Sequence, residues 1–211
     1  MLKNIANFFS YVFHPLLIPT YCFYTAMILC PEEFSTYPER KLKLSLMIMF
    51  ALTCLFPSII YIMMHKLEMI DDLDMRDKKQ RIIPYLVALF FYLAAFLCFK
   101  PRVGSLFIDQ TLIVGALLGA TLSLCISFFG NNFLKVSLHS NGVGGYFAFC
   151  IIASFYATQS AYWVVAFSII IMGIISASRI ILEAHTPREV IAGLASGMLG
   201  QYLAYKYYIA A

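Results

Sequence analysis

Residues 108–130 read IDQTLIVGALLGATLSLCISFFG and contain one charged residue, Asp109. An apolar run of this length matches the hydrocarbon core of a bilayer, which an α-helix crosses with about 20 residues. Backbone groups inside a bilayer must find their hydrogen-bond partners within the protein, so such runs predict helices. Similar runs lie roughly at 8–30, 42–65, 82–99, 143–158, 161–178 and 189–209. The first contains His14-Pro15 and Pro19, which predict a kink. The short turn at 158–160 predicts that the two runs beside it form a hairpin, with one long interrupted segment as the alternative. The sequence therefore predicts an all-α, polytopic transmembrane helical bundle of about six to seven spans.

The composition of the whole chain favours the same class. Of the 211 residues, 62% are hydrophobic and 12% are charged, and the mean hydropathy is +0.82. A soluble domain of this size does not have that balance. The six cysteines lie in or at the ends of apolar runs without CxxC spacing, so they predict neither a disulfide framework nor a zinc site. We expect a single domain over residues 1–211 and no cleavable signal peptide.

The most informative polar stretch lies before the last apolar run, where Ser178-Arg179 is followed by His185 and Glu189. Arginine offers N–H donors that match phosphate oxygens, and a neutral histidine can act as a nucleophile near pH 7. If the segment is helical, Arg179, His185 and Glu189 share one face, and the carboxylate can fix the ring in one tautomer. The alternative is an arginine that snorkels at a helix end beside a structural histidine.

The topology predicts that two other polar segments lie on the same side of the membrane as this stretch. If every run crosses the membrane, residues 66–81, 131–142 and 179–188 fall on the same side, together with His65, His139 and His185. Residues 135–145 read KVSLHSNGVGG. The glycines would let the backbone approach a ligand, the following helix start offers N–H groups to an anion, and His139 could protonate a leaving oxygen. The alternative is a helix–helix turn whose glycines serve packing.

Residues 71–84 read DDLDMRDKKQRIIP and precede another span. Their basic residues could bind phosphate or belong to a solvated loop. Their acidic residues suggest a rival function, because Asp-rich loops bind Mg²⁺ and diphosphate in intramembrane prenyltransferases. Such enzymes need a second acidic motif, and the acids after Pro84 are only Asp109, Glu183 and Glu189.

Together the three stretches resemble the type-2 phosphatidic acid phosphatase superfamily, whose motifs are KxxxxxxRP, PSGH and SRxxxxxHxxxD. The third motif corresponds to Ser178-Arg179, His185 and Glu189, with Glu in place of Asp, and the text to Gly193 is similar to the family's HxPxDVxAG. The resemblance covers residues 74–193. The second motif keeps Ser137 and His139. The first keeps Arg81, which Ile82 and Ile83 separate from Pro84, and Arg76, Lys78 or Lys79 would take the place of its lysine.

The resemblance implies a phosphohydrolase without metal or other cofactor. His185 would attack phosphorus and form a phosphohistidine, Glu189 would orient it, and His139 would protonate the leaving oxygen. The phosphoryl oxygens would be held by Arg179, Ser137, Arg81, Lys79 and Lys135. This agrees with phosphoryl transfer in general, which depends on positioning and charge stabilisation.

We therefore expect an integral membrane phosphatase whose partners are membrane lipids and a lipid phosphate or diphosphate substrate, such as phosphatidic acid, phosphatidylglycerol phosphate or a polyprenyl diphosphate. The net charge of +4 without a basic tail or stripe argues against nucleic acid. The alternatives are a lipid phosphotransferase or a non-catalytic lipid-phosphate binding or transport protein, and then the prenyltransferase. We expect a bacterial inner membrane. Nine basic residues on the site side against six on the other favour a cytoplasmic site, but at least three of the nine are assigned to phosphate, and the resemblance favours the outer face.

Overall fold

The computed structural model describes residues 1–71, 79–101 and 106–210, with only the backbone of Lys79, and this part of the chain contains helices and loops but no strand. The predicted all-α class is confirmed. In chain order the elements are α1 (Leu2–Val12), η1 (Pro15–Leu17), α2 (Ile18–Leu29), α3 (Pro31–Ser35), α4 (Glu39–Phe50), η2 (Ala51–Leu55), α5 (Phe56–Lys66), η3 (Lys79–Arg81), α6 (Ile82–Phe99), α7 (Thr111–Gly130), α8 (Leu138–Ser154), α9 (Tyr162–Ile181), α10 (Pro187–Ala204) and η4 (Tyr205–Ile209).

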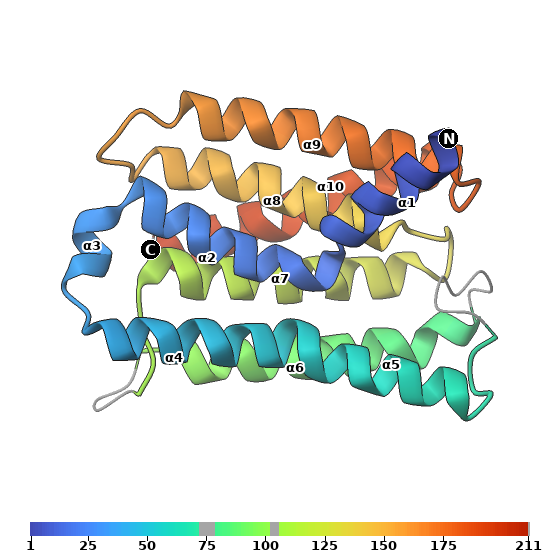
Figure 1. Cartoon of the computed structure of the whole chain (residues 1–211), viewed down its shortest axis with the longest axis horizontal. Helices are drawn as coiled ribbons and strands as arrows, with labels where there is room; N and C mark the ends of the chain where they lie inside the picture. The colour runs from blue at the N-terminus through green and yellow to red at the C-terminus, as the bar shows by residue number, and fades with distance from the viewer. Residues whose placement is uncertain (72–78, 102–105, 211) are drawn as a thin grey trace.

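Five helical segments are long and apolar enough to cross a membrane, which indicates an integral membrane protein: Leu2–Leu29, Glu39–Lys66, Ile82–Phe99, Thr111–Gly130 and Tyr162–Ile181. The other two predicted runs form α8 and α10, which lie alongside these helices in the bundle (Figure 1). The run expected to begin at residue 143 begins at Leu138, because Ser137 caps the helix with its hydroxyl. The polar residues of 138–142 are therefore inside a helix.

The first span is broken, as the His14-Pro15 pair predicted. Pro15 has no N–H for a helical hydrogen bond, so α1 ends at Val12 and the chain passes through η1 into α2. The two halves lie at an angle to each other (Figure 1). The turn is held by a hydrogen bond of 3.4 Å from the Leu16 N–H to His14 Nδ1, and by one of 3.1 Å from the Tyr92 hydroxyl to the Pro15 carbonyl.

Close packing of α10 against α8 and α7 depends on glycine. A Cβ atom on Gly144 of α8 would lie 2.6 Å from the Leu194 carbonyl oxygen, and one on Gly197 of α10 would lie 2.6 Å from the Gly145 nitrogen. Glycines at such positions let helix backbones approach closely in membranes. We call Gly144, Gly193, Gly197 and Gly200 the glycine seam; at Gly193 and Gly200 the neighbouring backbone is that of Ser137 and of Gly119, respectively.

A buried polar network joins the same three helices. Asn141 Nδ2 of α8 is 2.7 Å from Ser127 Oγ of α7 and 3.0 Å from Ser196 Oγ of α10. Ser123 Oγ donates back to Asn141 Oδ1 at 3.1 Å. An unpaired buried amide would be costly, so this network favours one arrangement of α7, α8 and α10.

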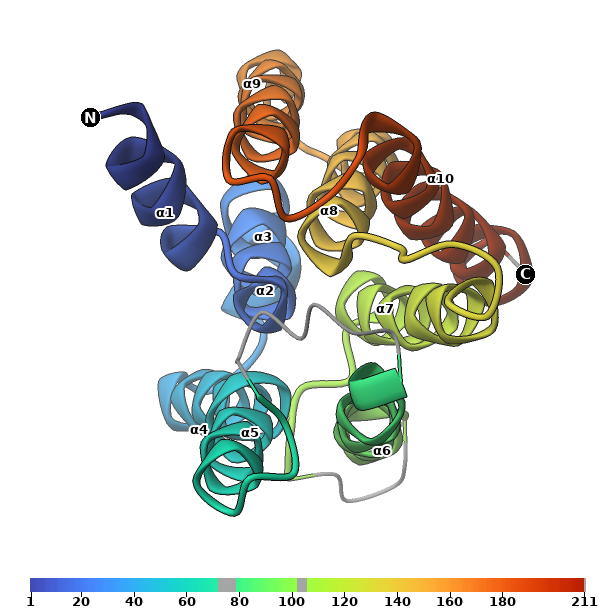
Figure 2. The same cartoon turned by 90° about the vertical axis from the view of Figure 1, so that its right-hand side faces the viewer.

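The end of α5 and the start of α6 lie at one end of the bundle, together with the connections from α7 to α8 and from α9 to α10 (Figure 1). The N-terminus lies at the same end. Seen from this end, α1 stands at the edge beside α9, while α4, α5 and α6 form the opposite side (Figure 2). The antiparallel pair α8 and α9 forms the hairpin expected from the short polar turn at residues 158–160.

Candidate functional site

Backbone and side-chain hydrogen bonds link the three polar stretches. Arg81 Nη1 donates to the Val136 carbonyl at 2.9 Å, which connects η3 to the α7–α8 loop. Lys135 Nζ donates to the Ala184 carbonyl at 3.0 Å, and the Ser137 N–H donates to the Glu189 carbonyl at 3.2 Å. Segments about 50 residues apart in the sequence therefore form one structural unit at this end of the bundle.

The His185–Glu189 pair is built on the start of α10. Thr186 is the N-cap, and its N–H donates to Glu189 Oε2 at 3.0 Å in a capping box. The same carboxylate oxygen lies 3.1 Å from His185 Nδ1. The predicted single helical face is wrong: α9 ends at Ile181 and α10 begins at Pro187, so His185 lies in the loop between them. The capping geometry, rather than a helical turn, brings the ring to the carboxylate.

Positive charge and burial control the ionisation of His185, which is 7% exposed. Burial, followed by the positive charges of Arg81, Lys135 and Arg179, lowers the pKa of His185 to about 3, and a hydrogen bond with the Lys135 backbone opposes this. The ring is therefore neutral at pH 7. A carboxylate only accepts hydrogen bonds, so the neutral ring with its proton on Nδ1 is the tautomer that Glu189 favours, and Nε2 then has the lone pair.

A cavity of about 640 Å³ opens at this site. Arg81, Arg179, His139 and His185 line it, and both arginines are buried, at 5% and 4% exposure. Buried guanidinium groups at a cavity wall are suited to an anionic ligand. The cavity continues between the helices and reaches Gln201 of α10, about 21 Å along the helix axis from Pro187 at 1.5 Å per residue.

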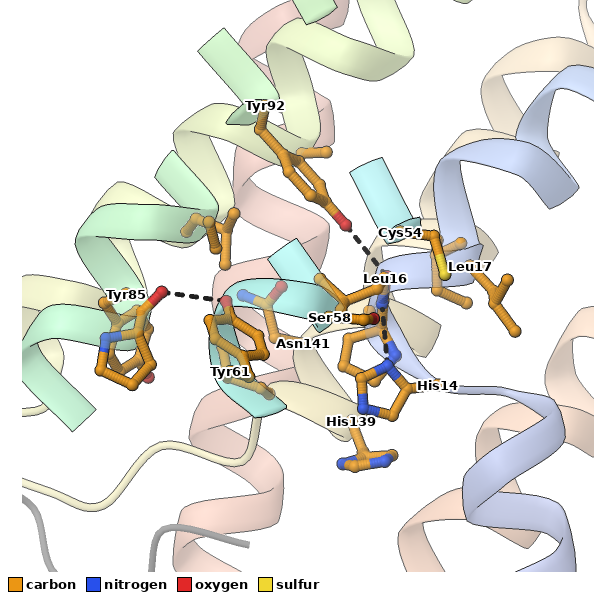
Figure 3. Close-up of a pocket in the computed structure, with 18 of the residues that line it drawn as sticks. His14, Leu16, Leu17, Cys54, Ser58, Tyr61, Tyr85, Tyr92, His139 and Asn141 are labelled. Atoms are coloured by element: carbon orange, nitrogen blue, oxygen red, sulfur yellow. Dashed lines mark hydrogen bonds between the residues drawn. The ribbon is translucent and has the colours of Figure 1, made fainter. Parts of the chain in front are cut away.

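The deeper part of the cavity is largely apolar. Its walls come from η1, α5, α6, α7 and α8, as the close-up shows (Figure 3), and include Leu16, Leu17, Ile62, Ala88, Ala120 and Leu124. Tyr61 and Tyr92 add hydroxyl groups that donate to the Pro84 and Pro15 carbonyls at 2.9 and 3.1 Å. Its volume is within the range of about 300–1,000 Å³ typical of small-molecule sites.

The remaining predicted residues are placed differently. Ser137 is fully buried, and its Oγ accepts from the Ser140 N–H at 3.3 Å as the cap of α8. Lys135 approaches the Ala184 carbonyl, and its charge acts on His185. The side chain of Lys79 lies outside the described residues. The glycines of 142–145 are in α8 rather than in a loop: Gly144 packs against α10, and Gly142 and Gly145 line the cavity.

Sequence analysis missed His14 as a site residue. His139 Nε2 is 3.2 Å from the Ser10 carbonyl oxygen, and the His139 ring lies 5.2 Å from the His14 ring, centroid to centroid, at an interplanar angle of 86°. Both rings line the cavity (Figure 3). The available signal was an ionisable residue within an apolar run, which in membrane proteins often marks a functional site.

Within residues 1–71, 79–101 and 106–210, no group of three or more His, Cys, Asp or Glu side chains is placed to hold a metal ion. His65, the histidine nearest in sequence to the Asp-rich stretch, has its Nδ1 3.2 Å from the Ile70 carbonyl. Asp72, Asp74 and Asp77 of the Asp-rich stretch lie outside the described residues. Comparison with protein families, curated proteins and solved structures found no match to this chain.

Proposed function

We propose that this chain is an integral membrane phosphohydrolase that acts on a lipid phosphate or diphosphate through a phosphohistidine on His185. The observation that supports this best is the His185–Glu189 pair at 3.1 Å, in which His185 is buried and Glu189 is partly exposed, beside Arg81 and Arg179 in the lining of a cavity. A neutral histidine oriented by a carboxylate is a competent nucleophile. Two guanidinium groups and the charge of Lys135 supply the electrostatic stabilisation that phosphoryl transfer requires.

The chemical steps balance with the residues present. His185 Nε2 attacks phosphorus, a P–N bond forms, and the P–O bond to the lipid breaks while His139 transfers a proton to the leaving oxygen. Water then attacks the phosphohistidine and gives its proton to His139 as the P–N bond breaks. The products are the lipid alcohol, or a lipid monophosphate from a diphosphate, and inorganic phosphate.

The cavity supports a lipid rather than a soluble phosphate ester. Its charged mouth is at the end of the bundle, and its depth is lined by Leu16, Ala88 and Leu124 between candidate membrane spans. Burying an apolar chain there is favourable by about 25 cal/mol per Å² of apolar surface removed from water. A tail inside the bundle would therefore strengthen binding of the phosphate at the mouth.

A second candidate is a lipid-phosphate binding protein without hydrolytic activity. It is favoured by the hydrogen bond between His139 Nε2 and the Ser10 carbonyl, which occupies one nitrogen of the proposed general acid. The two candidates differ in one product, because only the enzyme forms a covalent phosphohistidine.

The experiment is an acid-labile phosphoenzyme trap. Purified protein in detergent is mixed with ³²P-labelled phosphatidic acid or polyprenyl diphosphate and quenched in alkali, which preserves phosphohistidine. We expect label on the wild type, none on His185→Ala, and label on His65→Gln, a control histidine at the same end of the bundle. Binding of the lipid without label or phosphate release in the wild type would establish the non-catalytic alternative instead.

We place the site on the outer face of the inner membrane. Glu183 in the α9–α10 loop and Arg40 at the start of α4 are exposed at opposite ends of the bundle. In a Cys98→Ser background, Glu183→Cys should react with an impermeant maleimide in intact cells, whereas Arg40→Cys should need permeabilisation. The reverse pattern would put the site in the cytoplasm.

A further inference from the structure

The break in the first span places a second histidine against the proposed general acid. His14 is the N-cap of η1, and its ring meets the His139 ring edge to face at 5.2 Å (Figure 3). These residues come from the N-terminal helix pair and from α8, 125 positions apart in the sequence. Neither His14 nor the broken helix belongs to the three polar stretches from which the site was predicted.

The hydrogen bonds of the two rings determine where their protons are. The Leu16 N–H donates to His14 Nδ1 at 3.4 Å, so this nitrogen is unprotonated and the proton of His14 is on Nε2. The Ser10 carbonyl can only accept, so the His139 Nε2 atom at 3.2 Å must have the proton. His139 Nδ1 is then the nitrogen left to exchange a proton with a substrate.

We propose that His14 is a positioning residue for the general acid: fixed by the η1 backbone as a neutral Nε2–H ring, it supports His139 from one side while Ser10 holds it from the other, so that His139 Nδ1 serves the leaving oxygen. This inference rests on the proposed phosphohydrolase function. It gives the His-Pro break in the first span a role in the reaction.

The charges around the pair explain why a neutral ring is needed. Arg179 from α9, Arg81 from η3 and His185 from the α9–α10 loop line the same cavity. The other titratable residues of its lining are neutral side chains from α1, η2, α5 and α6: Tyr11, Cys54, Tyr61, His65, Tyr85 and Tyr92. When His139 becomes cationic to donate its proton, a second cation at the position of His14 would oppose it. The Leu16 N–H disfavours that cation, because a protonated His14 Nδ1 could not accept the bond.

Proton transfer can then be assigned to one atom. A substrate that binds as its phosphate monoanion gives its proton to Nδ1 of the resting neutral ring, and the cationic His139 passes this proton to the oxygen of the breaking P–O bond, becoming again the neutral Nε2–H ring bound to Ser10. In the second half of the reaction, Nδ1 takes a proton from the attacking water and returns it to the departing phosphate, so the resting ring is neutral. His14 exchanges no proton in either step.

The decisive variant is His14→Asn, because asparagine is a good N-cap that can accept the Leu16 N–H while removing the ring. Activity is measured on octyl phosphate, whose alkoxide leaves poorly, and on p-nitrophenyl phosphate, whose phenolate needs no proton. We expect a loss of about 10- to 100-fold in kcat on octyl phosphate, the scale of a misplaced catalytic group, and a loss below about threefold on p-nitrophenyl phosphate. KM should change little. The matched control is Tyr92→Phe, which removes the other bond to the η1 turn, to Pro15, without touching His139.

A double-mutant cycle completes the test. His139→Ala and His14→Asn/His139→Ala should have the same activity on octyl phosphate, because His14 acts only through His139. In ¹⁵N-histidine spectra, the wild-type His139 ring should be in the Nε2–H form, and His14→Asn should mix the tautomers. Additive losses, equal losses on both substrates, or a comparable leaving-group effect in Tyr92→Phe would overturn the role of His14. Wild-type protein that releases no phosphate from either ester and forms no phosphohistidine would instead overturn the proposed function, and the spectra would still decide whether His14 fixes the tautomer.

Discussion

Replacing Glu189 with glutamine separates the charge of the carboxylate from the hydrogen bonds that one of its oxygens accepts. Glu189 Oε2 accepts from the Thr186 N–H at 3.0 Å and lies 3.1 Å from His185 Nδ1. A glutamine carbonyl at the position of Oε2 can keep both bonds, from the Thr186 N–H and from His185 Nδ1, so the tautomer is retained. What is lost is the negative charge that stabilises the cationic imidazole ring as the P–N bond forms.

The size of the effect follows from the charge that is lost. A hydrogen bond to a charged acceptor contributes about 1–1.5 kcal/mol more than one to a neutral acceptor, which corresponds to roughly a 5- to 13-fold slower formation of phosphohistidine. Folding should change little, by about 1 kcal/mol or less, because the cap bond remains and only the helix-dipole interaction with the charge is lost. The assay is single-turnover labelling with saturating ³²P-lipid, together with thermal unfolding of the same preparation in detergent.

Thr186→Ala is the matched control. It removes the 3.4 Å bond from the Glu189 N–H to the Thr186 hydroxyl but leaves both bonds to the carboxylate. It should lower stability by about 1 kcal/mol and leave the labelling rate within about twofold of the wild type. If Glu189→Gln labels as fast as the wild type, or if both variants lose rate and stability in parallel, Glu189 acts only as a helix cap.

Three further predictions concern ionisation, packing and metal. The pKa of His185 is lowered to about 3, so between pH 6.5 and 3 only the unfolded chain binds this proton, and the protein becomes less stable as the pH is lowered. From pH 7.5 to 5 the free energy of unfolding should decrease by about 2 kcal/mol. Thermal unfolding of His185→Gln should lack this contribution to the pH dependence. Gly197→Ala, whose Cβ would collide with the backbone of Asn141 and Gly145, should destabilise by about 1–3 kcal/mol or more, whereas Gly173→Ala, with nothing within 4 Å, should be neutral or slightly stabilising in the same assay. Phosphate release should persist in EDTA because Arg81, Arg179 and Lys135 provide the positive charge, and an absolute Mg²⁺ requirement would favour the metal-bound diphosphate of the prenyltransferase alternative.

The apolar runs were sufficient to predict helices, because length and hydropathy alone decide whether a segment suits a bilayer. The start of α8 could not be predicted in this way. Asn141 interrupts the apolar pattern, and its amide is satisfied by Ser127 and Ser196 from other helices. Such partners belong to the tertiary structure and are not visible in the local sequence, so these residues were assigned to a turn.

The candidate site shows the same limit. The spacing of His185 and Glu189 predicted their contact, although through a helical turn instead of the capping box that makes it. The His14-Pro15 pair predicted a kink, since proline cannot continue the hydrogen-bond pattern. That the kink brings His14 to His139 depends on the packing of the N-terminal helices against α8 and α9, and no pattern within either segment indicates it.

The glycine seam fixes the position of α10 along its axis, and with it the position of the capping box at the site. Each of its glycines meets a backbone on the neighbouring helix, so α10 cannot slide along α8 without steric collision. The Ser137–Glu189 backbone bond at the mouth is therefore set by contacts a few turns away. One residue inserted between Glu189 and Gly193 would turn the capping box by about 100° relative to the seam, whereas the same insertion between Leu182 and Glu183 would lie in the α9–α10 loop and leave the capping box in register with the seam. Insertions and deletions should consequently be tolerated in the loop before His185 and excluded between Glu189 and the glycine seam.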